Sequence, residues 1–139
     1  MQIVEAHLIQ KPVRAHRRDG TAVAPLAALA CGLRGLTQHV ELRGFEITGG
    51  SGHCVQSTDA TYLNIIGNTI HECQQGGIRI DSSKAGVSHH HQILNNVIYN
   101  AGLVNSSNNA GSWPVILMVD QGADSLIAGN QVYNSHGEG

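Results

Sequence analysis

An internal repeat constrains the fold of this chain more than any other feature of its sequence. Four segments share one pattern: a short apolar strand, a two-residue corner rich in Gly and Asn, and a second short strand. They are Val40–Ile47, Leu63–Ile70, His91–Ile98 and Ser125–Val132. A further strand follows the first three segments, at Val55–Ser57, Gly77–Asp81 and Leu117–Asp120. Self-similarity of this kind is typical of a solenoid, in which each turn of chain packs on the next.

Stacking the segments in register produces columns of like residues. The aliphatic columns are Leu42/Ile65/Ile93/Ile127, Ile47/Ile70/Ile98/Val132 and Val55/Ile78/Leu117, and a mixed column is Ser57/Ile80/Val119. Another column holds Phe45, Asn68, Asn96 and Asn130. Stacked Asn amides can hydrogen-bond along the axis and to corner backbone groups that would otherwise be buried without partners. Three strands per turn and aliphatic inward columns predict a parallel β-solenoid.

Composition agrees with many short strands and tight corners. The chain has 139 residues, of which 17 are Gly, and only 13% are charged and 4% aromatic. After Arg43 the cations are Arg79 and Lys84, against seven acids, so we expect no nucleic-acid partner. The longest apolar stretch, Ala22–Ala30, is too short to span a membrane and lies too far into the chain for a signal peptide. We therefore expect no membrane partner.

Cysteine usage gives a further expectation. The three cysteines, Cys31, Cys54 and Cys73, show no CxxC spacing. At most one disulfide can form, and we expect buried free thiols instead.

The repeats resemble the right-handed parallel β-helix, or pectin lyase-like, superfamily. The resemblance lies in the corner with Asn followed by x-Ile and the later Gly-Ile-x-Ile, as in Gly77–Ile80, and in a Gly-Thr-x-x-x-Pro opening at Gly20–Leu26. It implies an all-β fold, a right-handed parallel β-helix of about four coils, with an irregular or capping N-terminal segment. Residues 1–39 are expected to form that segment and residues 40–139 the repeats.

The repeat pattern is interrupted where the next strand is due, after Gly137–Gly139. We therefore expect a β-helix truncated at its C-terminus, a fragment of a longer protein. An open solenoid end exposes strand edges, so self-association through the C-terminal edge is a further expectation.

Insertions point to a candidate site, because they collect on the binding face of solenoids. The third copy carries a longer connection at residues 100–114, and the second carries one at residues 82–91. Both flank the strands at Gly77–Asp81 and Val115–Asp120. We expect the two loops to wall a groove whose floor is this sheet.

The outward positions of that floor hold the candidate catalytic residues, Arg79, Asp81 and Asp120, with Gln56 beside them as a substrate-binding residue. Asp81 and Asp120 would be stacked neighbours on coils about 4.8 Å apart, with their carboxyl groups roughly 5–7 Å from each other, and like charges that close raise one pKa and permit acid–base work. The competing interpretation is that Asp81 only caps the next corner. Arg79 and Lys84 suit neutralising a uronate carboxylate or removing a proton. They are equally explained as solvated charges, one of them paired with Asp81.

Three further residues are candidate substrate-binding groups. His89 and His90 lie in the 82–91 loop, and Trp113 lies in the 100–114 loop, where an indole stacks on a sugar or packs on the solenoid. We assign no metal to the His89–His91 triplet, because consecutive residues of an extended segment point to opposite faces. His91 falls in the column of Leu63 and Ser125, which indicates a structural role.

The resemblance implies a carbohydrate-active protein, a fragment of a polysaccharide lyase or glycoside hydrolase with a polysaccharide as partner. It implies an extracellular or cell-surface location, and no cofactor, with Ca²⁺ as a candidate ion only if the chain is a lyase. The alternative is a non-catalytic structural solenoid of the adhesin or tail-fibre type. Fold alone does not choose between them.

Overall fold

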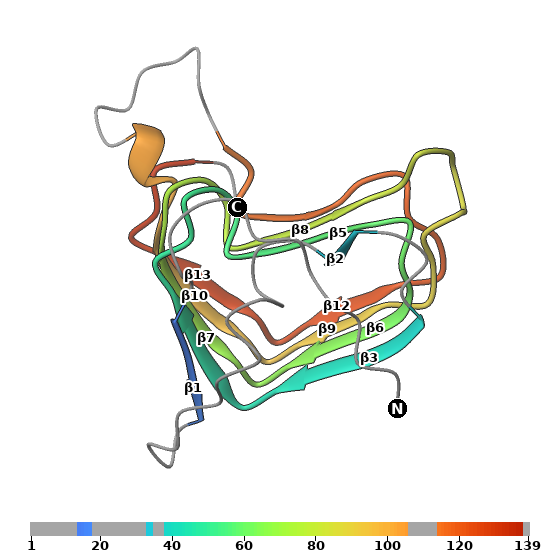
Figure 1. The fold of residues 1–139 in the computed structure, drawn as a ribbon, viewed down its shortest axis with the longest axis horizontal. Coiled ribbons are helices and arrows are strands. Elements are labelled where there is room, and N and C mark those ends of the chain that lie inside the picture. The colour runs from blue at the N-terminus through green and yellow to red at the C-terminus, as the bar shows by residue number, and fades with distance from the viewer. Residues whose placement is uncertain (1–13, 18–32, 35–37, 106–113, 138–139) are drawn as a thin grey trace.

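The computed structural model describes residues 14–17, 33–34, 38–105 and 114–137. These residues form an all-β structure whose strands lie in three sheets (Figure 1). Among the described residues, strands from successive turns of the chain pair in parallel, and β1 alone pairs antiparallel, with β4. The arrangement is consistent with the parallel β-solenoid that the repeat predicts.

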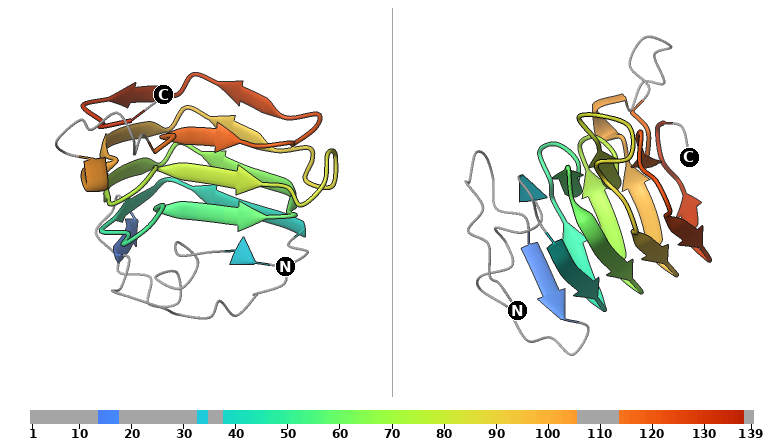
Figure 2. Two further views of the ribbon diagram at one scale, coloured as in Figure 1. Left: turned by 90° about the horizontal axis from the view of Figure 1, so that it is seen from above. Right: turned by 90° about the vertical axis from the view of Figure 1, so that its right-hand side faces the viewer.

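The chain passes through the three sheets in turn. The first sheet contains β1 (Arg14–Arg17), β4 (Phe45–Thr48), β7 (Thr69–Cys73), β10 (Val97–Ala101) and β13 (Gln131–Tyr133). The second contains β2 (Leu33–Arg34), β5 (Val55–Thr58), β8 (Ile78–Asp81) and β11 (Leu117–Val119). The third contains β3 (Gln38–Arg43), β6 (Thr61–Ile66), β9 (Gln92–Leu94) and β12 (Leu126–Ala128). A short 3₁₀ helix covers Leu103–Asn105. Each run through the three sheets is called a coil below, and Figure 2 shows the coils stacked side by side.

Strand pairing confirms the aliphatic columns. Ile47, Ile70, Ile98 and Val132 are register partners, and so are Leu42, Ile65, Ile93 and Ile127. Their members in the inner coils are fully buried. In the last coil Ile127 is 47% exposed and Val132 is 36% exposed, because no strand lies beyond them among the described residues. The self-association expected at this edge stays a prediction.

The Asn column forms the hydrogen-bonded ladder that the sequence predicts. Asn96 Oδ1 accepts bonds of 3.0 Å from both the backbone N–H and the side-chain Nδ2 of Asn68. Asn96 Nδ2 donates to the Ile65 carbonyl at 2.8 Å and to Asn130 Oδ1 at 2.9 Å. Asn68 Oδ1 in turn accepts from the Phe45 N–H at 3.0 Å. The ladder thus supplies hydrogen-bond partners to buried backbone groups at the corner, where strand pairing does not supply them.

The corners repeat a left-handed backbone conformation in every coil. One such column is Gly44, Gly67, Asn95 and Gly129, and a second is Gly49, Glu72, Asn100 and Asn134. A third is His39, Tyr62, His90 and Asp124, with φ between 49° and 59°. Gly and Asn tolerate this conformation, whereas a bulky side chain such as that of Tyr62 is strained in it. Tyr62 in the third column and Glu72 in the second are therefore the residues of these columns that the backbone favours least.

The expectation of buried free thiols is wrong for two of the three cysteines. Cys54 and Cys73 form a disulfide, and both side chains are fully buried. Cys54 precedes β5 and Cys73 ends β7, one coil later, so the stacking of coils brings together residues 19 apart in the sequence. Cys31 lies outside the described residues.

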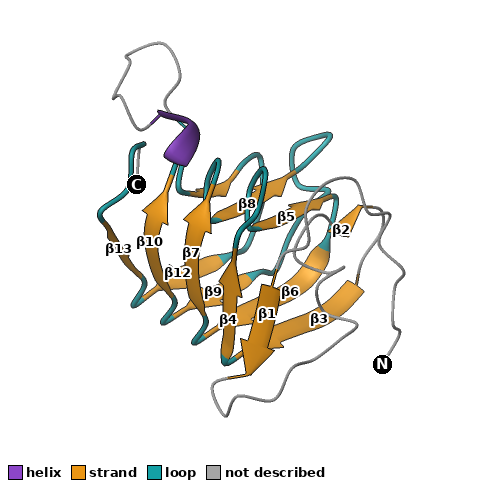
Figure 3. Cartoon of the chain, turned by 60° about the vertical axis from the view of Figure 1, so that its left-hand side comes forward, coloured by secondary structure: helices purple, strands orange, loops and turns teal. Residues whose placement is uncertain are grey.

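The N-terminal segment contributes two strands to the sheets. β1 lies antiparallel along β4, at the edge of the first sheet that faces away from β13 (Figure 3). β2 pairs in parallel with β5. Gly20–Leu26, which carry the resemblance to the family opening, lie outside the described residues.

Candidate functional site

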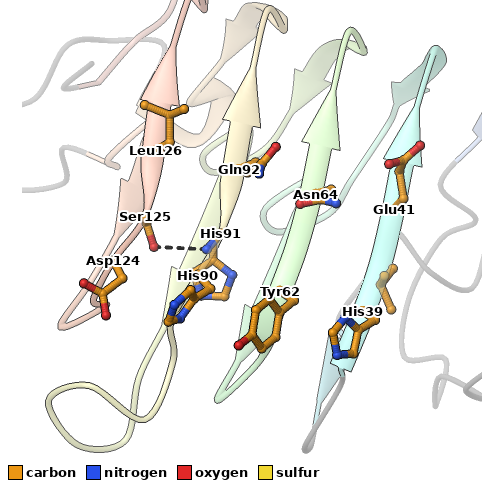
Figure 4. Close-up of a pocket in the computed structure, with 11 residues that line it drawn as sticks. His39, Glu41, Tyr62, Asn64, His90, His91, Gln92, Asp124, Ser125 and Leu126 are labelled. Carbon is orange, nitrogen blue, oxygen red and sulfur yellow. Dashed lines mark hydrogen bonds between the residues drawn. The ribbon is translucent and has the colours of Figure 1, made fainter.

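A groove of about 720 Å³ lies over the outer face of the third sheet, across β3, β6 and β9 (Figure 4). The side chains that line it come from equivalent positions in successive coils. They are His39, Val40, Glu41, Tyr62, Asn64, His90, His91, Gln92, Asp124, Ser125 and Leu126. The groove is therefore built by the repeat itself.

The first row along the groove is the left-handed column His39, Tyr62, His90 and Asp124. The His39 and Tyr62 rings stack with centroids 4.6 Å apart and planes at 9°. The Tyr62 and His90 rings stack at 4.9 Å and 27°. Both faces of the Tyr62 ring are thus covered by imidazoles, and the side chain is still 40% exposed. The row presents ring edges, with the phenol O–H and imidazole nitrogens, rather than open aromatic faces.

The second row lies two residues further along each strand, at Glu41, Asn64 and Gln92. Figure 4 shows it running parallel to the first row. The Arg43 guanidinium donates to the Glu41 carboxylate from Nε at 2.8 Å, and this bond lowers the pKa of Glu41. Glu41 therefore remains a carboxylate at neutral pH, and Asn64 and Gln92 add amide donors and acceptors.

His89 and His90 meet at one end of the ring stack. Their Nδ1 atoms are 2.7 Å apart, so one nitrogen carries a hydrogen and donates it to the other. The His89 ring also contacts Tyr62 edge-on, with centroids 5.7 Å apart. Three exposed or half-buried imidazoles, those of His39, His89 and His90, therefore surround one tyrosine.

His91 is buried below the groove, as its column predicts. Its Nδ1 accepts the Leu63 backbone N–H at 3.4 Å, so Nε2 carries the hydrogen and donates to Ser88 Oγ at 2.9 Å. The Ser88 hydroxyl donates onward to the Ala60 carbonyl at 3.1 Å. This imidazole does not accept the serine proton, so the pair is a structural network and not a nucleophile with its base.

The two buried imidazoles make stability depend on pH. Burial lowers the pKa of His91, and the charges of His89 and His90 lower it further. Burial also lowers the pKa of His53, and the charge of Arg79 lowers it further. Because the native state then binds fewer protons than the unfolded chain, the stability present above the ordinary pKa of 6.5 is lost as pH falls below it.

We therefore predict that the urea concentration at the unfolding midpoint decreases as the pH is lowered from 7 to 5. The His91→Gln variant, compared with wild type by circular dichroism across this range, should show a weaker pH dependence. If the urea midpoints of His91→Gln and His53→Gln both depend on pH as steeply as that of wild type, the buried imidazoles are not the cause of the pH dependence.

The predicted catalytic residues lie on a different face, the outer side of the second sheet. Gln56, Arg79 and Met118 are register partners, and Asp81 follows Arg79 by two residues on β8. The Arg79 Nε donates to both Asp81 carboxylate oxygens, at 2.8 and 2.9 Å. The structure thus contains the ion pair between Asp81 and a cation that the alternative interpretation predicts. This ion pair is partly exposed, and such pairs contribute little to stability.

Asp120 and Lys84 lie near this pair but are not bonded to it. The Asp120 backbone N–H donates to the Ile80 carbonyl at 2.8 Å, which places the residue beside Asp81 in the next coil. Its carboxylate is exposed and has no hydrogen-bond or ion-pair partner among the described residues. Lys84 is exposed in the loop that connects β8 to β9. The roles proposed for these residues stay predictions.

The sequence predicts a groove over the second sheet, which stays a prediction, and the structure shows a groove over the third sheet. His90 was among the predicted binding residues and does line this groove; His89 adjoins it. Trp113 and residues 106–113 of the second predicted wall lie outside the described residues. The sequence contains a signal for this groove, because each residue of the first row stands one position before a residue of one inward column. The row residues are His39, Tyr62, His90 and Asp124.

The described residues contain no group of three or more His, Cys, Asp or Glu side chains able to hold a metal ion. They also contain no helix long and apolar enough to cross a membrane. Fold and groove together define a parallel β-strand protein with a polar surface groove. No family model, curated protein or solved structure matches the chain.

Proposed function

We propose that this protein is a right-handed parallel β-helix of about four coils that binds a polysaccharide along the groove over the third sheet. The observation that carries the proposal is the pair of parallel rows of hydrogen-bonding side chains. Sugar hydroxyls both donate and accept hydrogen bonds. The rows offer carboxylates, amides, a phenol and imidazoles, which together supply both kinds of partner.

The repeat favours a polymer over a single small molecule. Strands of neighbouring coils lie about 4.8 Å apart, so equivalent groups recur along the axis at that step. A chain of sugars that runs along the axis therefore meets similar chemistry at each coil. A monosaccharide would contact only one or two coils.

Backbone strain in the first row supports a binding role for Tyr62. A left-handed backbone costs a non-glycine residue about 1–2 kcal/mol, and Asn would suffer less from it. The equivalent corner columns are occupied mostly by Gly and Asn. Strain retained at such a position is a mark of functional sites. The ring contacts of Tyr62 do no more than offset this strain, so the tyrosine brings no net gain in stability over Asn.

The disulfide supports an extracellular or cell-surface location. Disulfides persist in oxidising compartments and are rare in the cytosol. The Cys54–Cys73 bond agrees with a protein that meets polysaccharides outside the cell.

The proposal predicts that Tyr62→Asn weakens polysaccharide binding about tenfold without loss of stability. The substitution removes the phenol and three ring contacts, together worth about 1–2 kcal/mol, and relieves backbone strain of similar size. Binding would be measured by isothermal titration on a panel of neutral and acidic polysaccharides, with urea unfolding as the stability measurement.

The matched control is Tyr133→Asn, which alters an exposed ring of the His71–Tyr99–Tyr133 stack on another sheet. Equal affinities of wild type and Tyr62→Asn would rule out the groove as the binding face. Absence of binding to every polysaccharide would favour the structural solenoid instead.

Catalysis is tested separately on the same panel. Lyase chemistry releases unsaturated uronates, which absorb ultraviolet light, and hydrolysis releases reducing ends. Loss of either signal in Asp120→Asn or Arg79→Gln would place a catalytic site on the second sheet. Binding without either signal would favour a non-catalytic protein.

A further inference from the structure

Two consecutive imidazoles meet at one end of the ring stack, which a regular strand does not allow. In an extended segment consecutive side chains point to opposite faces. His90 instead has a left-handed backbone, with φ of 59°, and β9 begins only at Gln92. The rings of His89 and His90 therefore come together at this corner, and their Nδ1 atoms lie 2.7 Å apart. His91 takes no part, because it is buried and bonded to Ser88.

The pair is open to solvent and held in place by a neighbouring ring. His90 is exposed and His89 is half-buried. The His90 ring stacks on Tyr62 with centroids 4.9 Å apart, and the His89 ring contacts the same tyrosine edge-on with centroids 5.7 Å apart. Side chains that are already oriented lose less freedom when they bind an ion. Tyr62 is thus a positioning residue for the two imidazoles.

The spacing of the two nitrogens selects the kind of ion. Imidazole nitrogen is a suitable ligand for Zn²⁺, Cu²⁺ and Ni²⁺. With metal–nitrogen bonds of about 2.0 Å, nitrogens 2.7 Å apart subtend an angle of about 85° at the metal. That angle is near the right angle between neighbouring ligands in the tetragonal geometry of Cu²⁺ and Ni²⁺, whereas tetrahedral Zn²⁺ needs nitrogens about 3.3 Å apart. Of these ions, Cu²⁺ generally binds most tightly.

Binding an ion between the rings changes a tautomer and leaves the number of protons unchanged. In the free pair one ring carries its hydrogen on Nδ1 and donates it to the other Nδ1. When that ring carries the hydrogen on Nε2 instead, both Nδ1 lone pairs are free, and rotation of the rings directs them to one ion. Two metal–nitrogen bonds then replace one hydrogen bond.

A carboxylate stands next to the pair. His89 forms a parallel bridge with Ala123, and the His90 backbone N–H donates to the Ala123 carbonyl at 3.1 Å, so Asp124 is the neighbour of His90 on the next coil (Figure 4). The Asp124 side chain is exposed and has no hydrogen-bond or ion-pair partner among the described residues. Its negative charge favours a cation at the pair, without serving as a ligand.

We propose that His89 and His90 form a binding site for Cu²⁺, with the two Nδ1 atoms as neighbouring ligands and water in the remaining positions. The site goes beyond the proposed function and does not depend on it, because the ion binds without any polysaccharide.

The probe is Cu²⁺ alone, titrated into the full chain carrying Cys31→Ala, which removes the cysteine outside the Cys54–Cys73 disulfide. Isothermal titration should show one ion bound per chain, more tightly than Ni²⁺ or Zn²⁺. Electron paramagnetic resonance of the complex should show an axial signal with hyperfine coupling to two nitrogens. Neither measurement requires a variant of the site itself.

Matched variants locate the ion. His89→Gln and His90→Gln should each weaken Cu²⁺ binding by about tenfold or more and reduce the coupling to one nitrogen. His39→Gln, which alters the imidazole on the other face of Tyr62, should bind as wild type. Tyr62→Asn should weaken binding about tenfold and keep the coupling to two nitrogens, as expected of a positioning residue. Circular dichroism confirms the native fold of each variant.

The other outcomes count against the site. Absence of Cu²⁺ binding, a wild-type signal with one nitrogen, or binding that survives both His89→Gln and His90→Gln overturns the proposal. An equal loss of affinity in His39→Gln assigns the ion to a different set of imidazoles and also overturns it. Tighter binding of Zn²⁺ than of Cu²⁺ contradicts the tetragonal arrangement. None of these results bears on polysaccharide binding, so the two proposals fail separately.

Discussion

Replacing Asn96 with alanine should lower the free energy of unfolding by about 4 kcal/mol. The Asn96 side chain is fully buried and pairs with groups on both neighbouring coils. Its removal leaves the Asn68 N–H and the Ile65 carbonyl without these partners, and each buried unsatisfied group costs about 1–3 kcal/mol. Alanine also leaves a small cavity, which adds to the loss. Urea unfolding followed by circular dichroism measures the change.

Asn130→Ala is the matched control for this prediction. Asn130 makes the same kinds of bonds but is only half-buried, so water can replace part of what the amide supplies. Its effect should be about half as large. If Asn96→Ala costs less than Asn130→Ala, the ladder is not what pairs the buried corner groups.

Breaking the Cys54–Cys73 disulfide should cost about 3 kcal/mol. The bond closes a loop between residues 19 apart, and cross-links of this span restrict the unfolded chain by roughly that amount. The double variant Cys54→Ala/Cys73→Ala would be compared with wild type by urea unfolding, and mass spectrometry of the unreduced protein would identify the linked peptide.

Cys31→Ala serves as the control, because it removes a thiol without touching this bond. Because both sulfurs are fully buried, reduction of the native protein should be slow and should accelerate in urea. Equal unfolding midpoints for wild type and the double variant would show that the bond does not stabilise the native state.

Much of the fold was predictable because a solenoid converts sequence spacing directly into contacts. Residues that recur at Ile47, Ile70 and Ile98 are neighbours in space simply because each coil repeats the last. The same spacing predicts the Asn ladder and a structural role for His91. Local pattern and global structure agree at these positions, which is the condition under which prediction from a single sequence succeeds.

The groove over the third sheet was harder to predict because exposure and ring geometry do not follow from spacing. The insertions at residues 82–91 and 100–114 point to the second sheet, whereas the groove shown by the structure lies over the third sheet and takes only His90 and His91 from the 82–91 insertion. Arg79 and Asp81 were placed correctly on one face, but their mutual ion pair depends on side-chain direction. The stack of His39 on Tyr62 depends in the same way on a left-handed corner.

The amino-acid sequence by itself determined the parallel strand arrangement, its inward columns and its Asn ladder, because these depend only on which residue types recur and at what interval. Only the tertiary structure decided that Cys54 bonds to Cys73, that Arg79 engages Asp81, and that two polar rows form a groove over the third sheet. These features require side chains from different coils or different rotamers to meet at bonding distance. A one-dimensional pattern fixes which residues are neighbours, whereas the path of each corner decides which way their side chains point.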